Sequence, residues 1–339
     1  MLEPLSAALC PWLMQPFEQF ERARQQGQLG HSWLLTGPRG IGKANLACGI
    51  AARLLWPDAK LPQALDAKAA GEALRNRHEQ DAHHPDLYYL APAPEKRATS
   101  IEQVRDAIGA LSLTSHAGVA KVLIVDPAEN LTLAAANALL KTLEEPTQNT
   151  YFLLVSHQPG ILPATVRSRC QVVSLMPPPR GIALNWLTRG VNASDARDWA
   201  VLLRLAAGAP LRALELYDAE YVNINSELED IFEQISRIKI DPQTVADRWL
   251  KGDVEVYLRW LATRLEWVIK RRLAPDAWTP VTDLGEDRLH NAWCSLRLTT
   301  LFERLQGTQT LLGQLGRGVN VDLALRVLLL GFQPERGKT

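Results

Sequence analysis

The stretch Lys121–Cys170, KVLIVDPAENLTLAAANALLKTLEEPTQNTYFLLVSHQPGILPATVRSRC, decides the fold of this chain. Val122–Val125 and Tyr151–Val155 are short apolar runs bounded by polar or turn residues, which is typical of buried strands in a parallel sheet. Thr132–Glu145 is rich in Ala and Leu, begins with a good N-cap residue and is stopped by Pro146, so it predicts a helix. Strand, helix and strand at this spacing form a βαβ unit. The sequence therefore predicts an α/β fold with a parallel sheet.

Two residues of this stretch are candidates for chemistry. Asp126 directly follows the first predicted strand, at the edge where open α/β sheets bind ligands, and it can hold a phosphate-bound magnesium ion. Arg169 lies on the loop after the second predicted strand, where its guanidinium can reach another subunit. Each residue also has a plainer interpretation, Asp126 as the cap of a strand and Arg169 as an ordinary surface residue.

The composition indicates a folded protein with no dominant charge. The chain has 339 residues, enough for two or three domains, and its 37 Lys and Arg are balanced by 37 Asp and Glu. Because no global basic field can bind nucleic acid unaided, any DNA contact must be local or shared with partner chains. We see no signal peptide and no apolar run long enough to cross a bilayer, so we expect a cytosolic protein. The cysteines are scattered without a C-x-x-C pair, which excludes a zinc ribbon and argues against a disulfide framework: Cys10, Cys48, Cys170 and Cys294.

A second motif lies upstream of this stretch. Ser32–Thr36 predicts a short strand, which runs directly into GPRGIGK (37–43), the spacing of a phosphate-binding loop. The glycines of such a loop let backbone N–H groups turn toward phosphate oxygens, while the Lys and the N-terminus of the following helix supply positive charge. The alternative is a glycine-rich strand-to-helix turn that binds nothing. The candidate nucleotide-binding residues are Gly37, Gly40, Gly42, Lys43 and Asp126.

Two positions argue against hydrolysis at this site. Position 44 is Ala, where a phosphate-binding loop has a Ser or Thr whose hydroxyl ligates magnesium. Asp126 is followed by Pro127, where a working ATPase of this type has a Glu that polarises the attacking water. Glu129, three residues after Asp126, would need a different backbone path to reach a γ-phosphate. The sequence thus predicts a site that is degenerate and inactive, or nearly so, in hydrolysis.

The remaining N-terminal half adds helices and one more strand. Residues 1–29 have helical spacing of apolar residues, with a break from Gln26 onward. Leu87–Leu90 predicts a strand, and Ser100 with Gln103 forms a capping box that opens a helix over Ile101–Leu111. Between these elements, Trp56–His84 is a polar, Ala-rich insertion with helical composition. Its histidines have no cysteines or spaced carboxylate beside them, so we expect surface residues rather than metal ligands: His78, His83 and His84.

The C-terminal half predicts helices throughout and no catalytic constellation. Three prolines at 177–179 mark the exit from the sheet, and Asn185–Leu216 predicts a small helical domain. Beyond about Ala219, apolar stripes recur at helical spacing, and we expect them to form mostly core, with some facing neighbouring chains. The basic run 270–272 could touch DNA, although a solvated helix end is the plainer interpretation.

Taken together, GPRGIGK, VDPAENLT, NALLKTLEEP and SRC resemble the clamp-loader branch of the AAA+ ATPases, and in particular the bacterial DNA polymerase III loaders. The resemblance is strong from about residue 31 to residue 208 and faint beyond. It implies an AAA+ P-loop domain over residues 1–177, a helical lid domain over 178–218 and a helical collar domain for oligomerisation over 219–339. The zinc module of the family would fall in the Trp56–His84 insertion, which lacks its cysteines, so we expect no metal there.

The resemblance also implies roles for single residues. In this family the Ser-Arg-Cys motif supplies an arginine finger to the ATP site of an adjacent motor subunit, which gives that role in trans to Arg169. The family's sensor positions fall on His157 and on Leu211, with Arg212 one place away. With Ala44 and Pro127, four positions of the chain's own site therefore depart from a working motor, whereas the outward-acting Arg169 is kept. This asymmetry predicts a subunit that does not hydrolyse ATP but activates its neighbour.

The expected partners follow from the same resemblance. They are motor subunits of the gamma or tau type and a delta-type subunit in a heteropentamer, with the sliding clamp and primed DNA reached through the complex. We expect no required cofactor, and at most weak binding of ATP or ADP. The main alternative is a competent ATPase motor of the same assembly, and a third possibility, an unrelated P-loop kinase or helicase, is opposed by NALLKTLEEP and SRC.

Overall fold

A computed structural model of the chain describes residues 8–57, 64–75, 84–93, 96, 98–112, 115, 119–190, 196–218, 224–273, 293, 296–315 and 320–333. The chain folds into two compact units. Unit 1 comprises Met1–Ser194 and Ala207–Glu215, and unit 2 comprises Asp195–Ala206 and Leu216–Thr339. The boundaries of the three predicted domains stay a prediction.

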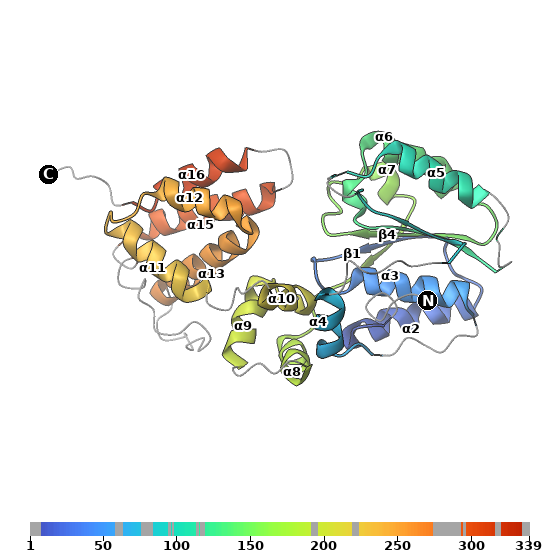
Figure 1. Cartoon of the computed structure of the whole chain (residues 1–339), viewed down its shortest axis with the longest axis horizontal. Coiled ribbons are helices and arrows are strands. Elements are labelled where there is room, and N and C mark those ends of the chain that lie inside the picture. The colour runs from blue at the N-terminus through green and yellow to red at the C-terminus, as the bar shows by residue number, and fades with distance from the viewer. Residues whose placement is uncertain are drawn as a thin grey trace. The chain divides into compact units, whose positions relative to one another are not determined.

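Unit 1 is built around a parallel sheet of five strands in the order β2-β3-β4-β1-β5 (Figure 1). The two strands of the predicted βαβ unit, β3 and β4, pair directly, with Ile124 opposite Leu153. The four predicted strands are confirmed to within a residue at each end, whereas β5 was not predicted. The strands are β1 (Ser32–Thr36), β2 (Leu87–Leu90), β3 (Lys121–Val125), β4 (Thr150–Ser156) and β5 (Gln171–Ser174).

Helices cover both faces of this sheet. Helices α2 and α3 lie on one face, and α5, α6 and α7 lie on the other (Figure 1). On the latter face, apolar side chains of the strands pack with those of the three helices into one continuous core. The helical segments of unit 1 are η1 (Pro11–Leu13), α2 (Met14–Gln25), α3 (Lys43–Leu55), α4 (Ala67–Arg75), α5 (Ile101–Ser112), η3 (Ala128–Asn130), α6 (Leu133–Glu144), α7 (Ala164–Arg167) and α8 (Arg180–Gly190), and α10 (Pro210–Asp218) lies mostly in it.

Local signals in the sequence set the ends of two of these helices. The Thr132 side chain accepts a hydrogen bond from the Ala135 N–H, so Thr132 is the N-cap of α6 as predicted. At α5, the Gln103 N–H donates to Ser100 Oγ at 3.4 Å and the Ser100 N–H donates to Gln103 Oε1 at 3.0 Å. Both halves of the predicted capping box are therefore present.

The N-terminal helix is shorter than predicted. Of residues 1–29, the α-helix occupies only Met14–Gln25, and a 3-10 turn with Pro11 at its start precedes it. Proline fixes its own φ angle and has no N–H, so it suits the first turn of a helix and not its interior. Residues 1–7 lie outside the described part of the chain, and Leu9 pairs with Ala64 in an isolated bridge.

The described residues of unit 2 form helices and the turns between them. The stripe predicted as core on α13 is buried, with Leu258, Leu261 and Leu265 all fully inaccessible. Phe232 packs edge-on or stacked against Trp249 and Trp260, at ring distances of 6.1 Å and 5.6 Å. The helices are α9 (Ala196–Leu205), α11 (Ile224–Ser236), α12 (Pro242–Lys251), α13 (Val254–Leu273), α15 (Leu298–Gln314) and α16 (Val321–Leu330).

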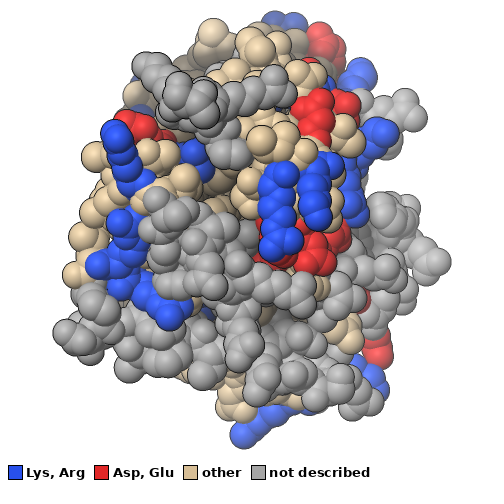
Figure 2. All heavy atoms as spheres, turned by 90° about the vertical axis from the view of Figure 1, so that its left-hand side faces the viewer, with Lys and Arg blue, Asp and Glu red and all other residues tan. Residues whose placement is uncertain are grey.

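The surface of unit 2 carries charges of both signs. Arg326 pairs with Asp322 and Asp247, and Arg248 pairs with Glu227. In Figure 2, Lys and Arg side chains stand beside Asp and Glu on the face shown. The end of α13 is also internally engaged, because Arg271 lies over the Trp267 ring and Arg272 donates to the Leu296 carbonyl. Among the described residues, none of the helices has the length and apolar content that a membrane span needs.

Candidate functional site

The phosphate-binding loop connects β1 to α3, as the sequence predicts. Gly37, Gly40 and Gly42 all have positive φ, a backbone conformation that residues with a side chain rarely adopt. Gly40 in particular has no room for a side chain, since a Cβ there would lie 2.4 Å from Cβ and 2.5 Å from the backbone N of Arg212. Glycine is therefore required here both by conformation and by the close approach of α10.

Lys43 begins α3 and is buried, with 2% of its surface exposed. Its Nζ donates to the carbonyl oxygens of Gly37, at 2.7 Å, and Pro38, at 2.6 Å. Burial lowers the pKa of this ammonium to about 8, although the nearby carboxylates of Asp126 and Glu129 oppose the shift. The lysine that would neutralise a bound phosphate is thus already hydrogen-bonded to the loop itself.

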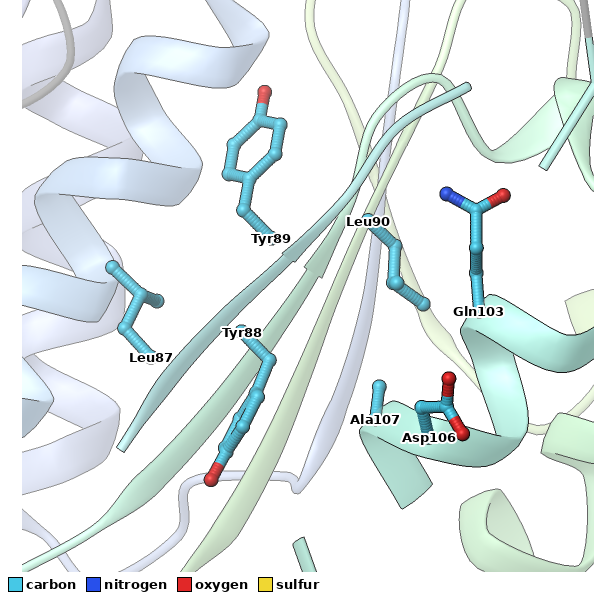
Figure 3. Close-up of a pocket in the computed structure, with 7 residues that line it drawn as sticks. All are labelled: Leu87, Tyr88, Tyr89, Leu90, Gln103, Asp106 and Ala107. Atoms are coloured by element: carbon cyan, nitrogen blue, oxygen red, sulfur yellow. The ribbon is translucent and has the colours of Figure 1, made fainter. Parts of the chain in front are cut away.

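Asp126 lies at the carboxyl end of β3, on the same edge of the sheet as the loop. Its Oδ2 accepts a hydrogen bond of 2.7 Å from the hydroxyl of Tyr89 on the neighbouring strand β2. In Figure 3, Tyr89 lines a pocket together with Tyr88 and side chains of α5, but alternation along β2 points it away from them. The partner of Asp126 had no signal in the sequence, because strand pairing brings the two residues together.

Glu129 and His157 meet behind the loop. The backbone N–H of His157, just beyond β4, donates to Glu129 Oε1 at 2.8 Å. Burial lowers the pKa of the His157 imidazole to about 4, and the Lys43 ammonium lowers it further against the opposing Glu129 carboxylate. A neutral imidazole at neutral pH therefore stands at position 157, which the resemblance assigns to a sensor.

The start of α10 closes over the loop. The backbone N–H of Leu211 donates to the Gly40 carbonyl at 3.0 Å, and the Leu211 side chain is buried. Arg212 is turned to Glu215, with Nη1 2.7 Å from Oε2, and the same carboxylate receives Arg39 at 3.3 Å. Leu211 and Arg212, which the resemblance assigns to the sensor region, therefore lie at the loop, Leu211 as an apolar side chain and Arg212 as an ion-paired arginine.

A tryptophan from the N-terminal segment completes this region. Trp12 Nε1 donates to the Ile41 carbonyl of the loop at 2.9 Å, and the indole meets Trp186 of α8 edge-on at 5.0 Å. Trp186 in turn donates to the Leu65 carbonyl. Sequence reasoning missed Trp12, because a single aromatic residue 29 positions before its partner gives no local signal.

Arg169 occupies a different part of unit 1, just after α7. Its neighbours Val166 and Cys170 belong to the buried core, so the backbone is anchored while the side chain remains 32% exposed. Its Nε donates to Glu144 Oε1 at 2.6 Å, and its Nη1 donates to the Thr165 carbonyl at 2.9 Å. The guanidinium is therefore held at the surface in a defined orientation.

The predicted site residues thus fall into two groups. One group gathers at one edge of the sheet: Gly37, Gly40, Gly42, Lys43 and Asp126. Arg169, by contrast, is held by the last residue of α6 and by a carbonyl of α7. Of the three histidines weighed as metal ligands, His78 and His83 lie outside the described residues. His84 meets the Trp56 ring edge-on and accepts the Asp86 N–H. Within the described ranges, there is no group of three or more His, Cys, Asp or Glu that could hold a metal ion.

Comparison with known proteins identifies the family. A family model described as "DNA polymerase III, delta subunit" matches residues 13–179. DNA polymerase III subunit delta' of Pseudomonas aeruginosa is 32% identical over 270 residues, which cover 80% of both chains. The chain belongs to the delta-prime subunits of DNA polymerase III. The delta-prime subunit of Haemophilus influenzae is 31% identical over 325 residues, 94% of this chain and 95% of that one.

A wider relationship extends to another subunit of the same polymerase. DNA polymerase III subunit tau of Escherichia coli is 31% identical over 196 residues, 57% of this chain and 29% of the tau chain. The delta-prime family membership confirms the resemblance to DNA polymerase III subunits that the motifs indicated. The parallel sheet with helices on both faces and the helical C-terminal unit confirm the predicted fold class.

Proposed function

We propose that this chain is the subunit of the clamp loader that does not hydrolyse ATP and that supplies Arg169 in trans to the ATP site of a neighbouring motor subunit. One contrast carries the proposal: Arg169 is anchored and exposed, whereas the chain's own nucleotide site is degenerate. Position 44 has no hydroxyl for a metal, Pro127 takes the place of a catalytic Glu, and Lys43 is bonded to Gly37 and Pro38. The main alternative remains a competent ATPase motor of the same assembly.

A guanidinium suits the proposed role. It is always charged, and its planar fork can donate to phosphate oxygens as charge develops in the transition state. It must also reach beyond its own chain, which requires exposure, and it must keep its direction, which requires anchoring. Val166 and Cys170 in the core and the contacts to Glu144 and Thr165 meet both requirements.

The chain's own loop supports weak nucleotide binding at most. A phosphate group would have to replace two hydrogen bonds of Lys43 to loop carbonyls, and it would find no hydroxyl at Ala44 to share a magnesium ion. The positive N-terminus of α3 and the glycine backbone remain available as an anion site. The proposal therefore includes weak binding of ATP or ADP that depends little on magnesium, and no required cofactor.

The proposed assembly is a heteropentamer with gamma- or tau-type motor subunits and a delta-type subunit, which acts on the sliding clamp and primed DNA. Unit 2 offers a surface for such neighbours, because one side of α16 exposes three apolar residues at helical spacing. Leu323, Val327 and Leu330 are 60%, 62% and 42% exposed. Apolar side chains on a helix face that is not covered within the chain are typical of an interaction site. The collar role of residues 219–339, the lid role of 178–218 and the cytosolic location belong to the same proposal.

Two measurements separate the proposal from its alternative. The isolated chain should show no ATP turnover above background, with or without primed DNA, whereas a competent motor would show turnover that Lys43→Ala abolishes. Motor subunits reconstituted with this chain should then load clamps faster than motor subunits reconstituted with its Arg169→Ala variant. Equal loading by the two complexes, both correctly assembled, would show that the finger role is wrong.

A further inference from the structure

Glu144 holds the guanidinium of Arg169, although 25 residues separate them in sequence. Glu144 Oε1 accepts from Arg169 Nε at 2.6 Å and also from Nη2 of the same side chain. On the other side of the guanidinium, Arg169 Nη1 donates to the Thr165 carbonyl at 2.9 Å and to Ser168 Oγ at 3.4 Å. Among the described residues, these contacts leave one N–H of Nη2 for an oxygen atom outside the chain.

The place of Glu144 in the helix makes a purely stabilising role a poor explanation. Glu144 is the last residue of α6, and Glu145 and Pro146 follow it. Because carbonyl groups make the C-terminal end of a helix partially negative, acidic residues there are less favourable than basic ones. The Arg169 and Glu144 side chains are also 32% and 47% exposed, and exposed ion pairs contribute little to folding. The contact between Glu144 and Arg169 is better explained by its effect on the orientation of the Arg169 guanidinium.

We infer that Glu144 is a positioning residue for the arginine finger, an inference that rests on the proposed function. Arginine has several rotatable bonds, and a finger without contacts would sample many orientations before one fits a neighbouring phosphate. The Glu144 carboxylate and the Thr165 carbonyl fix the plane of the guanidinium from two sides and direct the remaining N–H outward. Glu144 therefore raises the rate at the neighbouring ATP site without touching the nucleotide, and the KM for ATP at that site depends little on it.

A double-mutant cycle in the reconstituted loader tests this inference. ATP turnover and clamp loading are measured with wild-type chain, Glu144→Ala, Arg169→Ala and the double variant, with assembly checked by size-exclusion chromatography. We expect Glu144→Ala to lower the kcat of the dependent site roughly three- to tenfold and to change KM less than twofold. In the Arg169→Ala background the same substitution should have no further effect, because Glu144 acts only through Arg169.

Two more variants sharpen the result. Glu144→Gln keeps an acceptor oxygen at the same distance and should recover part of the lost rate, whereas the matched control Glu145→Ala on the adjacent acid should load clamps within twofold of wild type. An equal loss from Glu144→Ala with and without Arg169 would show a general structural effect and overturn the inference. A wild-type rate for Glu144→Ala, together with a clear loss for Arg169→Ala, would overturn the inference and leave the proposed function intact.

A measurement that does not depend on ATP turnover distinguishes a failure of the positioning inference from a failure of the proposed function. In the isolated chain labelled with nitrogen-15, the Nε–H resonance of Arg169, assigned by its absence in Arg169→Lys, should be sharp. It should broaden through solvent exchange in Glu144→Ala but not in Glu145→Ala. If this signal behaves as expected while Arg169→Ala leaves turnover unchanged, the proposed function is wrong and the contact is only structural. If the signal is already broad in the wild type, the positioning inference is wrong.

Discussion

Unit 1 contains two cations that phosphate chemistry could use, and their surroundings are opposite. Lys43 in the phosphate-binding loop is 2% exposed and donates to two carbonyls of its own loop. The Arg169 side chain is 32% exposed and held by a carboxylate and a carbonyl at the surface. The first arrangement satisfies the cation inside the chain, whereas the second leaves it partly exposed at the surface, where we propose that a neighbouring subunit meets it. Motifs alone name both residues, but only their contacts show which of them is available to another molecule.

The largest expected effect is on the exposed cation. Arg169→Lys keeps the charge but lacks the planar fork, so we expect the rate at the one dependent ATP site to fall by about a hundredfold or more. Total turnover of the loader should fall less, because other sites do not use this finger. Steady-state and single-turnover hydrolysis in the reconstituted loader measure both quantities. Arg167→Lys, at the last residue of α7, is the matched control. A wild-type single-turnover rate for Arg169→Lys would show that the planar fork of the guanidinium is not needed and would refute the comparison.

The next effect concerns how tightly the loop is closed. Gly40→Ala would place a Cβ 2.4 Å from Cβ of Arg212 at a positive φ of 80°, so we expect the free energy of unfolding to fall by about 3 kcal/mol. Urea denaturation followed by circular dichroism measures it. Gly160→Ala is the control, since no other atom lies within 4 Å of the added Cβ. Equal stabilities of the two variants would show that α10 does not pack on the loop.

His157 predicts a pH dependence of stability. Its pKa is about 4 in the folded chain and about 6.5 when unfolded, so the unfolded state binds more protons between these values. Stability should therefore fall as the pH drops from 6.5 to 4, and His157→Asn should remove that loss. We expect a difference of about 2 kcal/mol between pH 7 and pH 4 when the two proteins are compared by urea denaturation. Parallel pH profiles for both proteins would contradict a partly buried imidazole that is neutral in the folded chain.

The smallest effect is at the chain's own nucleotide site. Since position 44 offers no hydroxyl to magnesium, calorimetric titration with ADP should give weak binding whose Kd changes less than about threefold when magnesium is removed. Ala44→Ser restores the missing ligand and should introduce magnesium dependence if the loop can open. Tight, strictly magnesium-dependent binding of ADP by the wild-type chain would show that its nucleotide site resembles the site of a competent motor subunit. The contrast with Arg169 would then be wrong.

Local signals made much of the fold predictable from the sequence. The buried strands β1, β3 and β4 each have a continuous apolar run at their centre. The first turns of α5 and α6 depend on residues three positions apart, Ser100 with Gln103 and Thr132 with Ala135. The edge strand β5 was missed because Gln171, Val172 and Ser174 are exposed and show neither a buried run nor a clean alternation. Its place is set by pairing with β1, which is distant in sequence.

The site was predictable only as a set of residue types. Spacing identified Lys43 and Asp126, and the family resemblance identified Arg169. What each side chain contacts depends on elements far apart in sequence: Tyr89 reaches Asp126 across 37 residues, and Glu144 reaches Arg169 across 25. Glu144 is the last residue of α6, and nothing in the sequence around it indicates that Arg169 is the cation it pairs with.

The most direct test of the contrast between Arg169 and Lys43 is the rate of clamp loading by the reconstituted loader. The rate is measured for two complexes, one with Arg169→Ala and one with Lys43→Met in this chain. Both complexes are first shown to assemble with the wild-type stoichiometry. We expect Arg169→Ala to lose most of the loading rate, whereas Lys43→Met, which removes the cation of the chain's own loop but keeps its bulk, should load clamps at the wild-type rate. Wild-type loading by Arg169→Ala, or an equally large loss in Lys43→Met, would contradict the proposed division of roles between the two cations.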